Sequence, residues 1–174
     1  QGTLRRWIGN NKNIILVQRL KRMNTIQDKL ATGRAKNLSS MHDLAGCRLI
    51  FDSLDELHEF RRRFHTTRAK HERINGEKYD YITNPKDTGY RGIHDVYSYN
   101  VKEAPGNEWN GLKVEIQYRT KVQHAWATAV EIADALDGAR IKFDIGGNPD
   151  RERLFLLISE WLARRYENSS FLNI

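Results

Sequence analysis

Residues 112–119 have the sequence Leu-Lys-Val-Glu-Ile-Gln-Tyr-Arg, in which apolar and polar side chains alternate without interruption. A period of two places successive side chains on opposite faces of a β-strand, so this stretch predicts a half-buried strand. Its polar face carries Glu115, Gln117 and Arg119 in one row. This row suits a site that holds a metal ion or a hydroxyl group at one end and an anion at the other. A ladder of cross-strand ion pairs is the structural alternative.

The neighbouring segments predict an α/β (α+β) domain with a mixed sheet flanked by helices. A short apolar run at 47–51 predicts a central strand with Cys47 as a packing residue, and a further strand is expected at 93–99. Ser53 and Glu56 form a capping-box pattern at the start of a helix on which His58 and His65 are expected at the surface. Other helices are expected at about 12–31, 122–136 and 149–167.

Apolar periodicity also predicts which helix faces pack inward. On the first helix, the spacing of Lys21, Thr25 and Lys29 places three cationic or hydroxyl groups in one row, which suits a chain of phosphates. The other helices are expected to face the core with Leu57, Phe60 and Phe64; with Val122, Ala125, Trp126, Ala129, Ala133 and Leu136; and with Leu154, Leu157, Ile158, Trp161 and Leu162.

Composition limits the classes of function. The 174 residues contain one cysteine, which excludes a disulfide framework and fits a reducing cytoplasm. Neither a membrane span of ~20 apolar residues nor a signal peptide is visible, so we expect a cytoplasmic protein without a membrane partner. The first residue is Gln1 rather than Met, so we expect that the fragment lacks a natural start.

Positive charge is concentrated near the start of the chain. Residues 1–42 contain nine lysines and arginines and one acid, a net charge of +8, whereas the remainder carries −1. A segment of this kind attracts polyanions, either a nucleotide polyphosphate or an RNA backbone.

The stretch 79–94 is rich in loop-forming residues, among them Pro85, Gly89 and Gly92, which favour turns. Tyr90 and Arg91, displayed from such a loop, could stack on a base. A packed tyrosine beside a surface arginine is the structural alternative.

Four motifs now stand in order along the chain. They are Arg19-Leu20-Lys21 with Thr25 and Lys29; Asp43-Leu44-Ala45-Gly46-Cys47-Arg48; Tyr81-Ile82 through Pro85-Lys86 to Gly89-Tyr90-Arg91 and His94; and Glu115-Ile116-Gln117-Tyr118-Arg119-Thr120. In this order and spacing the motifs resemble the synthetase domain of the RelA/SpoT family, the bacterial alarmone synthetases. The resemblance covers roughly residues 14–136, and we expect 1–174 to form one domain.

The resemblance implies a nucleotidyltransferase-like fold and Mg²⁺-dependent transfer of the β,γ-pyrophosphate of ATP to a ribose 3′-hydroxyl, usually of GDP or GTP. It implies Asp43 and Glu115 as catalytic and metal-binding acids, with Glu115 orienting or deprotonating the hydroxyl. Expected contacts to the ATP phosphates come from Arg19, Lys21, Thr25, Lys29 and Arg48. Expected contacts to the acceptor come from Lys86, Tyr90, Arg91, His94, Gln117 and Arg119, with Tyr90 stacking on the base.

The sequence also departs from the family pattern. Thr88 and Gly92 stand where family members often have asparagine and serine, and both positions border the expected acceptor pocket. One alternative is therefore a toxin-type synthetase that pyrophosphorylates the 3′-terminal adenosine of tRNA, for which the basic N-terminal segment would serve. Homo-oligomers and an antitoxin partner are also compatible with the family.

Two other classes are disfavoured. His42-Asp43 and His94-Asp95 could suggest a metal-dependent phosphohydrolase, but that chemistry needs more histidine and aspartate ligands on a helical bundle than this chain offers. In a non-enzymatic RNA-binding module, the acids Asp43 and Glu115 would have no function.

Overall fold

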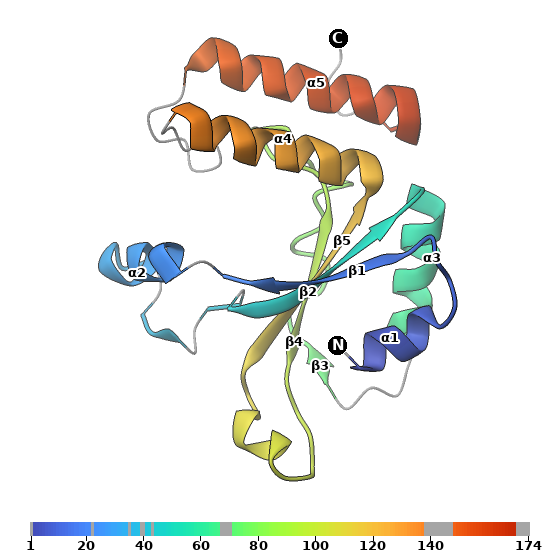
Figure 1. The fold of residues 1–174 in the computed structure, drawn as a ribbon, viewed down its shortest axis with the longest axis vertical. Helices are drawn as coiled ribbons and strands as arrows, with labels where there is room; N and C mark the ends of the chain where they lie inside the picture. Colours follow the sequence, from blue (N-terminus) through green and yellow to red (C-terminus); the bar gives the residue numbers. More distant parts are fainter. Residues whose placement is uncertain are drawn as a thin grey trace.

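A five-stranded sheet forms the middle of the molecule (Figure 1). The computed structural model describes residues 2–137 and 148–169, apart from 22, 35, 39, 40, 43 and 67–70. The strands are β1 (Ile15–Leu20), β2 (Ala45–Phe51), β3 (Glu72–Arg73), β4 (Ile93–Ser98) and β5 (Lys113–Thr120), in the order β1-β2-β5-β4-β3. β2 and β5 are parallel and the other pairs are antiparallel, which confirms the predicted mixed sheet.

Helices flank this sheet on several sides. They are α1 (Gly2–Ile8), α2 (Met23–Ala31), α3 (Leu54–His65), α4 (Lys121–Asp137) and α5 (Pro149–Glu167), with a 3₁₀ turn, η2, at Gly106–Trp109. In Figure 1, α1 and α3 lie together on one side, α2 lies on the other, and α4 and α5 run side by side across the top. The caps follow the sequence: the Ser53 hydroxyl accepts from the Glu56 amide, and the Asn148 side chain accepts from the Asp150 amide.

The hydrophobic core fills the space between the sheet and α1 with α3. The predicted inward residues of α3, Leu57, Phe60 and Phe64, are buried there, as is Cys47 of β2. Burial raises the pKa of the Cys47 thiol, so the residue packs as an apolar group rather than as a nucleophile. On β5, Ile116 and Tyr118 point into this core, in agreement with the alternation of its sequence.

β5 is buried on both faces, whereas its sequence predicted a half-buried strand. Glu115, Gln117 and Arg119 are only 8%, 3% and 2% exposed. Their face is covered because β5 is the middle strand and the chain around Tyr90 and His94 folds over it. A polar row buried in this way must satisfy its charges internally or with a ligand.

The predicted helix at 12–31 was only half right. Its first part is strand β1, and α2 begins at Met23. The β-branched and aliphatic run 14–17 favours a strand, and pairing of β1 with β2 along the whole length of β1 outweighs helix propensity there. Lys21 consequently precedes α2, so only Thr25 and Lys29 share a helix face.

The N-terminal positive charge is also spread over more than one element. Arg5 and Arg6 belong to α1, on the α3 side of the sheet, whereas Arg19 belongs to β1 and Lys29 to α2 (Figure 1). The positive charge of residues 1–42 is therefore divided between two sides of the sheet.

The faces of α4 and α5 differ most from the prediction. Trp126 and Leu162 do pack inward, but Leu136 is 79% exposed, and on α5 Leu154 and Trp161 are 54% and 58% exposed. Leu157, Ile158, Ala125 and Ala129 are exposed as well. The buried face of α5 carries Ser159, Glu160 and Ala163 instead, because polar contacts to the loop at 79–92 set the rotation of this helix.

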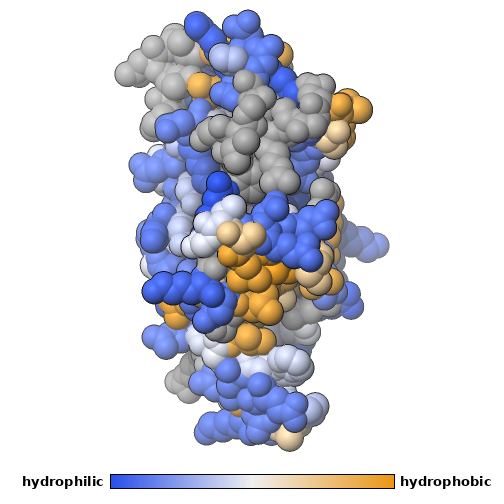
Figure 2. All heavy atoms as spheres, turned by 90° about the vertical axis from the view of Figure 1, so that its left-hand side faces the viewer, coloured by the Kyte–Doolittle hydropathy of each residue, from blue (hydrophilic) through white to orange (hydrophobic). Residues whose placement is uncertain are grey.

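Further apolar side chains gather on the side of the molecule that carries α2. Figure 2 shows them about halfway up this face. Leu20 and Met23 are 70% and 65% exposed, and Val17 lies on the free edge of β1. None of the helices described has the length and apolar character needed to cross a bilayer.

Candidate active site

The register of the sheet brings three chain segments together around Glu115. Arg19 of β1 pairs with Gly46 of β2, and Gly46 pairs with Glu115 of β5, so the three lie in one row. Because Gly46 has no side chain, the Arg19 guanidinium reaches across it to within 3.6 Å of the Glu115 carboxylate. A Cβ on Gly46 would lie 2.2 Å from the Glu115 carbonyl oxygen, so the close approach requires glycine.

The next row of the sheet continues this array. Arg48 of β2 pairs with Gln117 of β5, and Arg48 Nε donates to Gln117 Oε1 at 3.0 Å. The other end of the same amide, Gln117 Nε2, donates to Glu115 Oε1. The Gln117 side chain is thus hydrogen-bonded to both Arg48 and Glu115. The polar row predicted on β5 is therefore part of one hydrogen-bonded network.

A second chain of hydrogen bonds reaches Glu115 from the other side. Arg119 donates to the Tyr90 hydroxyl at 2.7 Å, and this hydroxyl lies 2.5 Å from His94 Nε2. His94 Nδ1 lies 3.4 Å from Glu115 Oε2. A neutral imidazole with its proton on Nδ1 satisfies all three contacts, because Tyr90 then donates to Nε2 and Nδ1–H faces the carboxylate.

Protonation states in the site follow from these contacts. Burial alone would raise the pKa of Glu115, but the hydrogen bond of His94, the charge that His94 carries when it is protonated, and the charge of Arg19 outweigh burial and bring the pKa to about 2. Burial lowers the pKa of His94, so its ring is neutral at neutral pH. The site therefore presents one ionised carboxylate, oriented on both of its oxygens.

Among the residues that the structure describes, cations outnumber acids around this carboxylate. Burial, followed by the charge of Arg119, lowers the pKa of Arg48 to about 10. His124 of α4 belongs to the same cluster, since burial and then Arg48 and Arg119 lower its pKa. Arg119 Nε and His124 Nδ1 are buried and have no hydrogen-bond partner within the described part of the chain. A surplus of positive charge with unused polar atoms fits an anionic ligand such as a polyphosphate.

An aromatic wall stands beside the cluster. Tyr81 meets both Tyr90 and His94 edge to face, and Lys86 Nζ lies 4.6 Å from the centre of the Tyr81 ring and 5.4 Å from that of Tyr90. The expectation of a displayed Tyr90 is wrong for this structure, because the residue is 6% exposed and Arg119 lies over its ring. Tyr81, half-buried in the same wall, was missed, although three tyrosines within 79–90 were a visible signal.

Arg91 is not displayed either. It is 5% exposed, and its guanidinium donates to Glu160 of α5 at 2.7 Å. The next turn of α5 adds Arg164, whose Nε donates to the other oxygen of Glu160 at 2.8 Å. The structure therefore places Arg91 in a buried ion pair, away from the array around Glu115.

Asp43, the second predicted acid, lies outside the described residues. No group of three histidine, cysteine, aspartate or glutamate side chains suited to a metal occurs in the part of the chain that the structure does describe. Glu115 itself fits a divalent cation, since it is an ionised oxygen donor of the kind Mg²⁺ prefers. A magnesium site would need Asp43 as its second acid.

A separate charge cluster on the opposite face of β4 was not foreseen. Asp95 is fully buried, accepts from Arg61 at 2.8 and 3.1 Å, and lies 2.7 Å from His65. His65 is therefore not the surface residue that its spacing suggested, whereas His58 is exposed as expected. Arg73 and Glu77 extend the cluster toward solvent.

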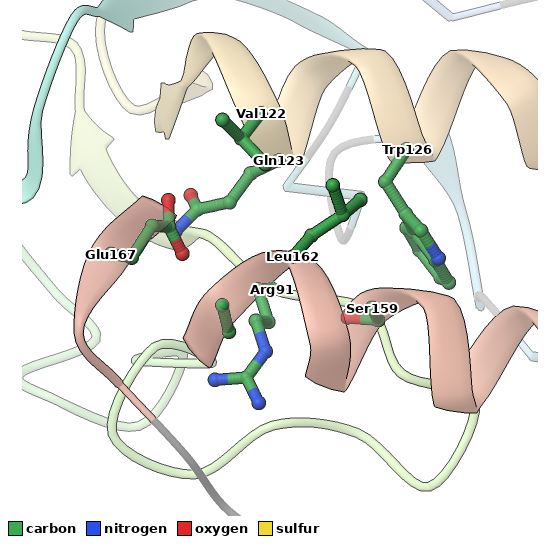
Figure 3. A pocket seen from close by; sticks show the side chains of 8 residues that line it. Arg91, Val122, Gln123, Trp126, Ser159, Leu162 and Glu167 are labelled. Atoms are coloured by element: carbon green, nitrogen blue, oxygen red, sulfur yellow. The ribbon is translucent and has the colours of Figure 1, made fainter. Parts of the chain in front are cut away.

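A hollow that Glu115 does not line lies between α4 and α5 (Figure 3). It measures about 220 Å³, part of which is open solvent. Its lining consists of Arg91, Val122, Gln123, Trp126, Ser159, Leu162, Ala163 and Glu167. Because Arg91 is held there by Glu160, this hollow marks where α5 contacts the loop rather than where the cation cluster would bind a ligand.

Fold and site together define a mixed-sheet protein with one buried, ionised carboxylate inside a cationic face. The family model described as a region found in RelA/SpoT proteins matches residues 18–134. The chain belongs to the RelA/SpoT family, which confirms the resemblance seen in its motifs.

Individual relatives are similar over different lengths. GTP pyrophosphokinase YjbM of Bacillus subtilis (strain 168) is 30% identical over 91 residues, which cover 52% of this chain and 41% of that relative. The match thus spans less than half the length of the relative. Among solved structures, small alarmone synthetase 1 from Bacillus subtilis bound to its product pppGpp superposes with a TM-score of 0.72 and 23% identity, covering 94% of this chain and 80% of that chain.

A GTP pyrophosphokinase family protein from Streptococcus pneumoniae gives a TM-score of 0.71 at 23% identity, covering 94% of this chain and 78% of that one. At this level of identity the two solved structures establish the fold. They confirm the predicted architecture of a mixed sheet flanked by helices.

Proposed function

We propose that this protein is a pyrophosphokinase that transfers the β,γ-pyrophosphate of ATP to the ribose 3′-hydroxyl of GDP or GTP. Membership of the RelA/SpoT family supports this activity. The observation that carries the proposal is the ionised Glu115 carboxylate, on which two hydrogen-bond chains converge within a surplus of cations.

The reaction asks the protein for positioning and for charge neutralisation. The 3′-oxygen of the acceptor bonds to the β-phosphorus of ATP, the bond from that phosphorus to the α,β-bridging oxygen breaks, AMP leaves, and the hydroxyl proton is released to solvent. Arg19 and Arg48 flank Glu115 on the side of β1 and β2. We assign them to the ATP phosphates, with Lys21, Thr25 and Lys29 as further contacts from the segment that follows β1.

Glu115 is assigned to orient the attacking 3′-hydroxyl. Its carboxylate is ionised and is held at both oxygens, by Gln117 and by His94, so it accepts a hydrogen bond from that hydroxyl in a defined direction. Mg²⁺, held by Asp43 and Glu115, would supply charge neutralisation for the transferred group.

The acceptor is assigned to the opposite side of Glu115. One wall of this side is formed by Lys86, Tyr90 and His94. Gln117 and Arg119 contribute their side chains from β5. A Cβ at Gly92 would lie 3.2 Å from the Arg119 side chain, so the glycine gives Arg119 room where relatives often have serine. Access to the face of Tyr90 requires Arg119 or Lys86 to move aside.

Incubation of the protein and Mg²⁺ with γ-³²P-ATP and one acceptor at a time tests this proposal. We expect label on GDP or GTP, with release of AMP. Label on deacylated tRNA alone would assign the terminal adenosine as acceptor and a toxin-type activity, and an antitoxin would then be the partner to seek. Absence of label on every acceptor would reject the proposal.

A further inference from the structure

α5 lies outside the segment that matches the family model, yet it contacts the loop at 79–92 at several points. The strongest contact is the ion pair between Arg91 and Glu160, whose side chains are 5% and 1% exposed. Breaking one partner of such a pair leaves a buried charge without compensation, so the contact fixes the loop firmly.

A second contact lies two residues earlier in the loop. Ser159 Oγ donates to the carbonyl oxygen of Gly89 at 2.5 Å. Gly89 has a φ of +84°, and a Cβ there would lie 3.0 Å from Leu156 Cα and 3.1 Å from Ser159 Cβ. The backbone of the loop therefore rests directly on α5, in a conformation that favours glycine.

α5 is itself anchored to the domain through α4. Trp126 Nε1 donates to the carbonyl oxygen of Phe155 at 2.9 Å, and the two rings meet edge to face. Figure 3 shows Trp126, Ser159 and Arg91 around the same hollow. The loop is thus fastened to α5, and α5 is fastened to α4, which continues directly from β5.

Tyr90 lies between the two fastened residues, Gly89 and Arg91. Its hydroxyl is the link between Arg119 and His94, and its ring contacts Lys86. Any shift of Gly89 or Arg91 would therefore move the hydroxyl and ring of Tyr90 relative to Glu115.

We propose that Ser159 and Glu160 are positioning residues that hold the acceptor-binding loop through Gly89 and Arg91. The inference rests on the proposed function, in which this loop contacts the acceptor. The proposal also gives Arg91 a different role from the one expected from the sequence: Arg91 fixes the loop instead of contacting the acceptor. The outer face of α5 takes no part, so the effect belongs to two residues and not to the helix in general.

The kinetic test compares Glu160→Gln and Ser159→Ala with the exposed control Glu59→Gln. We expect Glu160→Gln to raise the acceptor KM by about tenfold and Ser159→Ala by about threefold, while the ATP KM changes by less than about twofold. The control should leave both constants unchanged. Equal changes in the acceptor KM and the ATP KM, or no change in either, would overturn the inference. If Glu160→Gln does not fold, the KM values of Ser159→Ala provide the test.

Hydrogen exchange gives a readout that does not depend on activity. The amides of Lys86 and Gly89 are hydrogen-bonded within the loop, and we expect both to exchange faster in Glu160→Gln and Ser159→Ala, while β2 and β5 exchange as before. Unchanged exchange in the loop would reject the positioning role. If wild-type protein transferred no pyrophosphate, the proposed function would fail while the exchange result still decided whether α5 holds the loop.

A double variant tests whether Glu160 acts through Arg91. If one ion pair carries the effect, Arg91→Gln combined with Glu160→Gln should raise the acceptor KM no more than either single substitution. Additive losses would show that Arg91 has a separate role at the acceptor and would contradict the reassignment.

Discussion

His94 and Asp95 are neighbours on β4, yet their side chains lie on opposite faces of the sheet in charge clusters of different kinds. The negative charge of Asp95 is balanced within the protein, because both of its oxygens accept hydrogen bonds from Arg61 and His65 adds a further contact. Around Glu115, beside His94, the described residues carry a surplus of cations, and buried polar atoms of Arg119 and His124 have no hydrogen-bond partner among them.

The comparison separates two uses of a buried carboxylate. A cluster that neutralises itself, like that of Asp95, ties α3 to β4 and stabilises the fold. A cluster with excess positive charge is complete only when an anion binds. Substitutions on the two faces should therefore have opposite signatures, loss of activity on one face and loss of stability on the other.

The largest effect is expected at Glu115. Glu115→Gln keeps the shape of the side chain and removes its charge, so the hydroxyl acceptor and the proposed metal ligand are lost together. We expect kcat to fall by about 10³-fold, while the far-UV circular dichroism spectrum stays that of the folded protein. A fully active variant would remove the central residue from the mechanism.

Asp95→Asn should have the reverse signature. It leaves Arg61 and His65 facing a neutral group, and loss of one partner of a buried ion pair costs about 3–5 kcal/mol. Urea unfolding measures this loss, and kcat of the fraction that remains folded should stay near the wild-type value. A large drop in kcat without destabilisation would mean that the two faces are not separate in function.

The pH dependence of unfolding sharpens the same contrast. Burial would raise the pKa of Asp95, but the hydrogen bond and charge of Arg61 outweigh it and hold the pKa below the ordinary value. The stabilisation is therefore present above the unfolded-state pKa of about 4 and is lost as pH falls through the lower folded-state value. Wild-type stability should decline more steeply below about pH 4 than that of Asp95→Asn.

A smaller kinetic effect is expected at Arg48. Its guanidinium orients Gln117 and contributes to the cationic face. Arg48→Met removes both, and because a hydrogen bond to a charged group contributes about 1.5–3 kcal/mol, the ATP KM should rise by about 10- to 100-fold. Fluorescence titration with a non-hydrolysable ATP analogue checks this independently of turnover; unchanged affinity would exclude Arg48 from the ATP site.

The smallest expected effect belongs to the Tyr90 hydroxyl. Tyr90→Phe keeps the ring but removes the link between Arg119 and His94, at a cost of about 1 kcal/mol. We expect kcat/KM for the acceptor to fall by about fivefold. A loss as large as that of Glu115→Gln would give this hydroxyl a direct chemical role.

Local sequence patterns predicted the parts of the fold that local forces determine. The alternation at 112–119 predicted the faces of β5, and the capping box at Ser53 marked the start of α3. Seven residues of the active face, Arg19, Arg48, Tyr90, His94, Glu115, Gln117 and Arg119, followed from motif order and are now joined by contacts.

Long-range pairing could not be predicted in the same way. β1 was mistaken for helix because only its register with β2 makes a strand of that segment. On α5, apolar periodicity predicted a face of which only Leu162 packs inward, since the contacts of Glu160 and Ser159 lie about 70 positions away in the sequence. The pairing of Asp95 with Arg61 left no local signal either, and the acceptor assignment of Lys86 stays a prediction.

Phosphorus NMR of a reaction with ATP and GDP tests the central claim most directly, because it identifies every phosphorus-containing product at once. The account predicts one AMP for each new diphosphate group, with the inner phosphorus of that group coupled to the ribose 3′-proton. Formation of ADP and inorganic phosphate without a 3′-linked signal would contradict it.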